Sequence, residues 1–255
     1  MSDTLVRYDV DGAVARVTLD SPHNHNALSS ALVTQLRERL TEAAQSGARA
    51  VVLGHTGKTF CAGADLSEAT DGDPGDLAVA RAREMTAMLR SILELPIPVL
   101  AAVDGHVRAG GMGLVGACDI AVAGPASTFA LTEARIGVAP SIISLTLLPK
   151  LTARAAGRYF VTGEKFDSAT AAAIGLITAA AADVGAAVTA FTAEIVKGSP
   201  QGLAASKALT TASILADFDA HADELAIQSA RLFTSDEARE GMLAFLQKRS
   251  PNWLS

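Results

Sequence analysis

The first fifth of the chain alternates between two hydrophobic periods. Residues 13–20 alternate apolar and polar positions, which predicts a strand that leaves through the polar turn of residues 21–26. Leucines then recur at four-residue spacing between Ser29 and Ala44, which predicts an amphipathic helix. Residues 48–55 follow as a short apolar strand. Because a crossover helix returns the chain to the same edge, this unit predicts a parallel sheet.

The next stretch predicts further strands and one long helix. Residues 69–76 form an acidic loop rich in Gly and Pro, which we expect to be mobile because it carries little apolar surface. The helix predicted over residues 77–95 stops where Pro96 forbids continuation. Residues 98–103 and 119–124 are apolar and predict two buried strands.

Beyond residue 150 the pattern changes to successive helices. They are predicted over residues 152–163, 168–176, 184–200, 202–214 and 235–249. The last has Ser, Asp and Glu in its first turn and Lys and Arg at its end, which matches capping and dipole preferences. The sequence therefore predicts an α/β core over residues 1–195 and a helical C-terminal region over residues 196–255.

Composition narrows the class of protein. Of the 255 residues, 49% are hydrophobic but only 4% are aromatic, so the core must be built from Ala, Leu, Val and Ile. The net charge is −6 and the basic residues stand singly, which argues against nucleic-acid binding. No signal-peptide pattern and no apolar run of membrane-spanning length is present, so we expect a cytoplasmic protein that is not bound to a membrane.

Cysteine and histidine spacing gives no sign of a metal or a disulfide. Cys61 and Cys118 lie alone in apolar surroundings, which favours buried thiols in a reducing compartment. The histidines never join Cys or acidic residues at ligand spacing, and His23 and His25 indicate a polar turn. We therefore expect no metal cofactor.

Residues 111–116 fit the G-x-G-x-x-G spacing of a dinucleotide-binding loop. That fingerprint needs the strand to run straight into the first glycine, whereas here seven residues follow Val103. It also needs an acidic residue that closes a strand, and Glu133 lies inside TFALTEAR instead. A dinucleotide site is therefore rejected.

The glycines fit another use better. Gly110 and Gly111 form a turn in which a backbone N–H can approach a ligand, and Gly63 permits a conformation that leaves the Ala64 N–H pointing outward. Two backbone donors from separate loops are what an oxyanion hole requires. The alternative is that both segments are tight turns after strands.

Several blocks of sequence, in order, carry a resemblance to a known family. They are SPHNHNALS, FCAGADL, AVDGHVRAGGMGLVGACDIAVAG, TFALTEARIGVAP, YFVTGEKFDSATAAAIGLI and EGMLAFLQKRSPNW. In this order and spacing the chain resembles the enoyl-CoA hydratase/isomerase (crotonase) family over nearly its whole length. The resemblance implies an α/β fold with a crotonase-like ββα spiral core and a helical C-terminal trimerisation region. It also implies a homotrimer or a homohexamer built as a dimer of trimers.

The resemblance assigns residues to an acyl-CoA thioester, with coenzyme A as part of the substrate and no separate cofactor. The N–H groups of Ala64 and Gly110 match the pair that holds the thioester carbonyl. Five residues match positions that contact the adenine, the pantetheine or another part of coenzyme A: Ala62, Asp65, Leu66, Phe245 and Lys248. The last two are expected on the terminal helix and reach the substrate of a neighbouring subunit. His23 and Asn24 replace basic residues of many members, so this segment departs from the family's phosphate contact.

The catalytic carboxylates depart from the family's pattern. Hydratases of the family hold water between two glutamates. The matching positions here are Glu133 and Gly113, and Gly113 can hold neither a proton nor a water. The first hypothesis is a hydratase that uses Glu133 as acid and base. The second is a Δ3,Δ2-enoyl-CoA isomerase, since moving a double bond needs one base. The third is a non-catalytic acyl-CoA-binding protein.

Two further residues have alternative readings. Arg135 could pair with a carboxylate of the substrate, and the competing interpretation is a solvated or salt-bridged arginine. Asp119, at the end of the short glycine-rich helix, is interpreted as structural.

Overall fold

The computed structural model describes residues 3–67 and 74–254, whose strands form two sheets. The larger sheet contains, in spatial order, β1 (Val6–Asp11), β2 (Val14–Leu19), β3 (Ala50–His55), β5 (Val99–Val103), β7 (Ile120–Ala123) and β10 (Ala179–Ala180). The smaller contains β4 (Thr59–Cys61), β6 (His106–Arg108), β8 (Thr128–Ala130) and β9 (Phe166–Asp167). Only the pairs β1–β2 and β8–β9 are antiparallel within these sheets.

Successive strands alternate between the two sheets, and this alternation places the loops. β3, β5 and β7 belong to the larger sheet, and each is followed at once by β4, β6 or β8 in the smaller. The helices α2 (Pro74–Glu94) and α3 (Gly110–Ala117) then lead the chain back after β4 and β6. Because β4, β6 and β8 pair in parallel, the segments that leave them emerge at the same edge of the smaller sheet.

The predicted strand–helix–strand start is confirmed. α1 (Ser30–Gln45) is capped by the Ser29 side chain, which accepts a hydrogen bond from the Leu32 N–H, and its leucine stripe is buried. β2 and β3 pair in parallel, as the crossover argument requires.

Several boundaries differ from the prediction. α2 begins at Pro74, so residues 74–76 belong to a helix and not to the predicted loop, whose remaining residues lie outside the described ones. Proline is well suited to the first helical position, where its missing N–H has no partner to lose. α8 (Pro200–Phe233) runs far past the predicted end at residue 214. α9 (Asp236–Leu246), capped by Ser235, stops short of the predicted end at residue 249.

The remaining helical segments lie near the predicted ranges or are short. They are α4 (Ser141–Leu147), α5 (Ala153–Thr162), α6 (Ser168–Ala173), α7 (Val184–Ile195) and the 3-10 turns η1 (Pro22–Asn24), η2 (Glu133–Ile136) and η3 (Asn252–Leu254). The strands of the smaller sheet have only two or three residues each, too few to show a hydrophobic period, and were missed for that reason.

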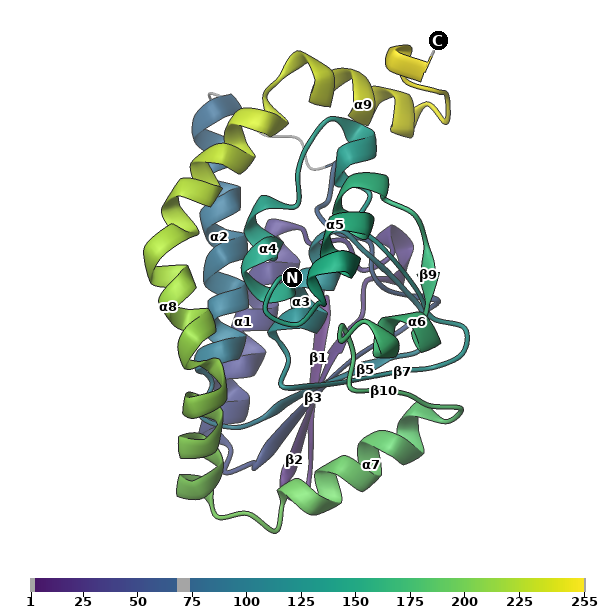
Figure 1. Cartoon of the computed structure of the whole chain (residues 1–255). Helices are drawn as coiled ribbons and strands as arrows, with labels where there is room; N and C mark the ends of the chain where they lie inside the picture. Colours follow the sequence, from purple (N-terminus) through teal and green to yellow (C-terminus); the bar gives the residue numbers. More distant parts are fainter. Residues whose placement is uncertain (1–2, 68–73, 255) are drawn as a thin grey trace.

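α8 joins the C-terminal region to the core. It packs along α2 and α4, and Figure 1 shows α8 lying beside α2. Its Ile214, Phe218 and Ala226 belong to the same hydrophobic cluster as the residues of the large sheet. The boundary predicted at residue 195 coincides with the end of α7 and stays a prediction.

A buried ion pair ties α8 to the glycine-rich segment. The Lys207 ammonium lies 2.8 Å from the Asp119 carboxylate and also donates to the carbonyls of Ile92 and Ile97. Asp119 accepts a further hydrogen bond from the Val99 N–H. Asp119 therefore has the structural role that the sequence indicated.

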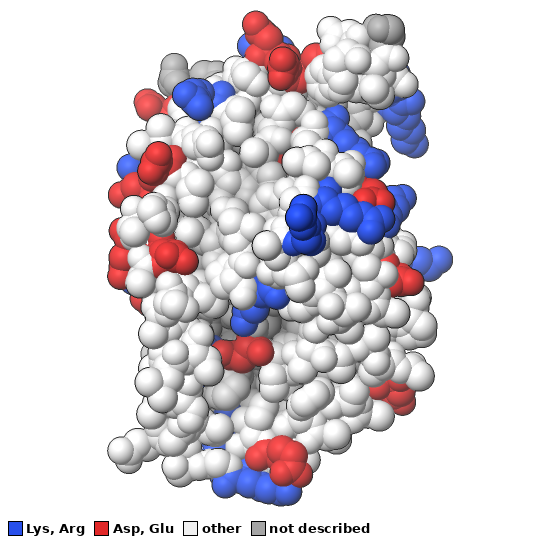
Figure 2. Space-filling view, viewed as in Figure 1, with Lys and Arg blue, Asp and Glu red and all other residues white. Residues whose placement is uncertain are grey.

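Charged side chains lie scattered over the face of the molecule that Figure 2 presents. Figure 2 shows basic and acidic side chains interspersed over one face, with wide uncharged areas between them. None of the helices within residues 3–67 and 74–254 is long and apolar enough to cross a bilayer.

Replacing Lys207 tests the tie between α8 and the core. Lys207→Met leaves the Asp119 carboxylate and two carbonyls without their buried partner, so we expect the free energy of unfolding to fall by about 3–5 kcal/mol. Urea denaturation measures this change. Lys197→Met, which breaks the exposed pair with Glu194, is the control and should cost less than about 1 kcal/mol. Equal losses in the two variants would contradict the assignment.

Candidate active site

The candidate catalytic groups leave three neighbouring strands of the smaller sheet. Gly63 and Ala64 follow β4, Gly110 follows β6, and Glu133 follows β8. The Ala109 N–H extends the pairing of β6 and β8 by donating to the Ala130 carbonyl. Parallel pairing therefore gathers at one sheet edge groups that lie about 70 residues apart in sequence.

The N–H of Ala64 is turned outward by the pairing of its neighbours. Leu28 forms a parallel bridge with Ala64, in which its N–H donates to the Gly63 carbonyl at 2.7 Å and its carbonyl accepts from the Asp65 N–H. In such a bridge the middle residue points its own N–H the opposite way. Among the described residues, the Ala64 N–H has no acceptor.

The second turn lies directly against the first. Ala109 has a φ of 46° and precedes Gly110, the first residue of α3, whose N–H also finds no acceptor in the described part of the chain. Gly63 has a φ of 94°, and a Cβ there would lie 2.8 Å from the Ala109 Cβ and 3.3 Å from the Gly110 nitrogen. Only glycine permits this approach of the two turns.

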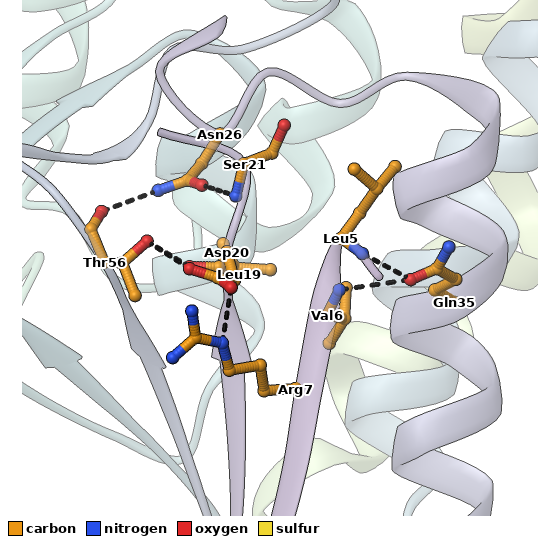
Figure 3. Close-up of polar contacts among 9 residues, drawn as sticks. All are labelled: Leu5, Val6, Arg7, Leu19, Asp20, Ser21, Asn26, Gln35 and Thr56. Atoms are coloured by element: carbon orange, nitrogen blue, oxygen red, sulfur yellow. Dashed lines mark hydrogen bonds and ion pairs between the residues drawn. The ribbon is translucent and has the colours of Figure 1, made fainter. Parts of the chain in front are cut away.

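Asn26 holds the segment that leads into Leu28, and the sequence reading missed it. Its side chain accepts from the Ser21 N–H and donates to the carbonyls of Thr56 and Thr59, as Figure 3 shows for the first two residues. Asn26 is fully buried with a φ of 53°, a conformation that asparagine tolerates better than other residues with a side chain. An Asn before a helix cap was the only sequence signal available.

Glu133 is a buried carboxyl group that is not part of an ion pair. It opens η2, is 7% exposed, and its Oε2 has no hydrogen-bond partner in the described residues. Burial raises the pKa of Glu133 to about 7, because the charged form loses its hydration. A carboxyl group that titrates near neutrality suits both proton donation and proton removal.

The C-terminal helix packs on the turn that carries Glu133. A Cβ at Gly241 of α9 would lie 2.5 Å from the Ile136 carbonyl, and one at Gly137 would lie 2.6 Å from the backbone of Glu237. The two backbones therefore touch without side chains between them, so α9 fixes the position of η2.

The position that the resemblance assigns to a first glutamate is filled by a neighbour. A Cβ at Gly113 would lie 2.4 Å from the Cγ2 atom of Ile143 on α4. The Thr146 hydroxyl also donates to the Gly113 carbonyl. The lack of a carboxylate here is thus built into the packing of α3 against α4, and Gly113→Glu alone would not fit.

Three residues expected to contact coenzyme A lie on the loop after β4. Ala62 and Leu66 are half-buried, and the Ala62 N–H donates to the His25 carbonyl. Burial opposes ionisation of Asp65, but hydrogen bonds from Ser67 and Asn24 outweigh it and lower the pKa of this carboxyl. Asp65 therefore joins the loop to η1.

The other two residues lie at the end of α9. Phe245 is on the helix and 65% exposed. Lys248, expected on the terminal helix, lies beyond its last residue with a φ of 53°, so that placement was wrong. The helix ends early because Lys248 enters the left-handed conformation common at helix C-termini.

Three further side chains have well-defined surroundings. The Arg135 Nε donates to the Thr162 carbonyl, and the residue is exposed. Burial raises the pKa of both Cys61 and Cys118 to about 12, so these thiols are inert.

Comparisons with known proteins agree with this architecture. The family model for enoyl-CoA hydratase/isomerase matches residues 9–255. The "Probable enoyl-CoA hydratase" of Rhodobacter capsulatus is 33% identical, with 99% of each chain covered. The "Cyclohexa-1,5-dienecarbonyl-CoA hydratase" of Thauera aromatica is 30% identical, with 95% of this chain and 93% of the relative covered. A crystal structure of an enoyl-CoA hydratase from Mycobacterium avium is 64% identical, with a TM-score of 0.93 over 99% of this chain and 100% of that chain.

The fold is that of the crotonase-like α/β proteins. The chain belongs to the enoyl-CoA hydratase/isomerase family. The resemblance seen in the sequence is confirmed, whereas trimerisation and the roles of individual residues stay predictions.

Replacing Glu133 should stabilise the protein at high pH. Because its pKa is raised, the folded state binds this proton more tightly than the unfolded state, so stability is lost as pH rises from about 4.5 through about 7. Glu133→Gln removes this loss. We expect the free energy of unfolding of the variant, measured relative to the wild type, to be about 3 kcal/mol higher at pH 8 than at pH 4.

Denaturation of both proteins across this pH range measures the effect. Glu164→Gln is the matched control, because this exposed carboxylate pairs with Arg158 and should give no gain at high pH. A Glu133→Gln variant with no pH-dependent gain would show that Glu133 titrates at its ordinary value.

Proposed function

We propose that the protein adds water to a 2-enoyl-CoA thioester, with Glu133 as its acid and base. The observation that carries the proposal is one buried, unpaired carboxyl group that leaves the same sheet edge as two outward-facing backbone N–H groups. The hydratase names of its relatives support water addition as the first choice of reaction.

The N–H groups of Ala64 and Gly110 would donate to the thioester oxygen. That oxygen becomes negatively charged when the double bond is attacked, so the two hydrogen bonds strengthen in the transition state. Loss of one such donor typically costs about 2.7–4 kcal/mol of transition-state stabilisation.

The reaction balances with one carboxylate. As the water oxygen bonds to Cβ, ionised Glu133 takes the water's proton, and the electron pair of the double bond moves to form the enolate. The protonated Glu133 then gives that proton to Cα, which yields the 3-hydroxyacyl thioester and the ionised carboxylate. Neither a metal nor a redox group is required.

A second candidate is isomerisation of a 3-enoyl-CoA. It is favoured by the packing of Ile143 against Gly113, because the family's first glutamate has no counterpart there and Glu133 is left as the one base. Glu133 would remove a proton from C2 and return it to C4.

The wider assembly is also a proposal. The substrate's coenzyme A would lie along Ala62, Asp65 and Leu66. Phe245 and Lys248 would reach it from a neighbouring subunit of a homotrimer or homohexamer, since both are exposed near the end of α9.

Incubating the protein with 2-enoyl-CoA and 3-enoyl-CoA tests the function. A hydratase consumes the absorbance of the conjugated thioester and adds the mass of water, whereas an isomerase creates that absorbance without a mass change. We expect hydration, and we expect Glu133→Gln to lower kcat at least about 100-fold, because the proton transfer is lost.

Glu164→Gln should retain full activity as the matched control. Binding of a saturated acyl-CoA should be unchanged in Glu133→Gln. Turnover that survives Glu133→Gln would contradict the assignment of the base. If the wild-type protein binds acyl-CoA but turns over neither substrate, it would be identified as an acyl-CoA-binding protein.

A further inference from the structure

α3 and α4 lie side by side and run in the same direction. Ile143 touches Gly113, and a Cβ at Gly116 would lie 3.1 Å from the Leu147 side chain and 2.9 Å from the Thr146 carbonyl. The contacts thus advance along both helices together. Gly110 is the first residue of α3 and Ser141 the first residue of α4, so the two helices begin at the same end of this contact.

Ser141 carries a buried hydroxyl group with no protein partner. The residue is 6% exposed, and its Oγ has no hydrogen bond in the described residues. Its backbone groups are satisfied locally, since its N–H donates to Ala139 and its carbonyl accepts from the Ser144 hydroxyl. A buried hydroxyl without a partner destabilises a fold, and this one is free to form a hydrogen bond with a molecule outside the chain.

The same stretch of chain holds a second such atom. Of the four buried side-chain atoms without a partner in the described residues, those of Tyr8 and Arg39 lie on β1 and α1. The other two, from Glu133 and Ser141, come from one segment of nine residues that folds back through the Val138 N–H to the Glu133 carbonyl. At Gly113 the neighbouring group is the apolar side chain of Ile143.

We infer that the Ser141 hydroxyl holds the water that adds to Cβ, in place of the missing first carboxylate. This inference rests on the proposed hydratase function. The Ser141 hydroxyl donates one hydrogen bond to that water or accepts one from it, while ionised Glu133 accepts the water's proton. Ser141 is neutral and transfers no net proton, so the one-carboxylate balance is unchanged.

Ser141→Ala tests the inference. We expect kcat for hydration to fall about tenfold, the effect of one neutral hydrogen bond, with KM for the acyl-CoA within twofold. Conversion of 3-enoyl-CoA, which needs no water, should proceed at the wild-type rate where the protein catalyses it. The melting temperature should stay equal or rise, because an unpartnered hydroxyl is removed from the interior.

Ser144→Ala is the matched control, one turn further along α4. Its hydroxyl donates to the Ser141 carbonyl, so the variant should keep full hydration and lose some stability. Unchanged hydration in Ser141→Ala, while Glu133→Gln abolishes it, overturns the role of Ser141 and leaves the proposed function intact.

Two other results also overturn the inference. A fall in hydration together with a lower melting temperature would show a structural hydroxyl. A wild-type protein that hydrates none of the 2-enoyl-CoA thioesters would remove both the inference and the proposed function.

Discussion

The backbone pairing of Leu28 with Gly63 and Asp65 is the interaction on which the candidate site depends. It is a single parallel bridge outside both sheets, and it decides which way the intervening Ala64 N–H points. Asn26 supports this bridge, because its side chain joins the Ser21 N–H to the carbonyls of Thr56 and Thr59. The close packing of Gly63 against Ala109 then brings the second turn alongside.

The candidate acid lies in an environment that opposes folding. A carboxyl group without a partner, buried at the first residue of a short 3-10 turn, lowers stability wherever it is ionised. The structure tolerates it because the surrounding backbone is fixed by contacts that leave no room for side chains, at Gly137 and Gly241. Such local conflicts are typical of functional sites in otherwise consistent folds.

Much of the architecture could be predicted from the sequence, and what could not has physical reasons. The leucine stripe of α1 and the parallel pairing of β2 and β3 follow from periodicity. The strands of the smaller sheet are too short to show a period, although their ends carry the candidate chemistry. Gly63 and Gly110 could be singled out by their glycine turns, and Glu133 by the resemblance.

The sequence showed that Gly113 stands where the family has a glutamate, but it did not show the packing that accompanies this difference. That packing is a contact between Gly113 and Ile143, which lie on different helices, and no pattern within either helix predicts it. The same holds for the burial of the Ser141 hydroxyl and for the ion pair of Lys207 with Asp119, because both arise only when separate helices pack together.

The docking of α9 against η2 also bears on the order in which the molecule matures. Residues 236–246 are synthesised about 100 residues after Glu133, yet they supply the surface on which its turn rests. A nascent chain on the ribosome can complete both sheets while this turn is still unsupported. We therefore expect the turn that carries Glu133 to reach its final position only after the C-terminal helix has been released and has packed against it.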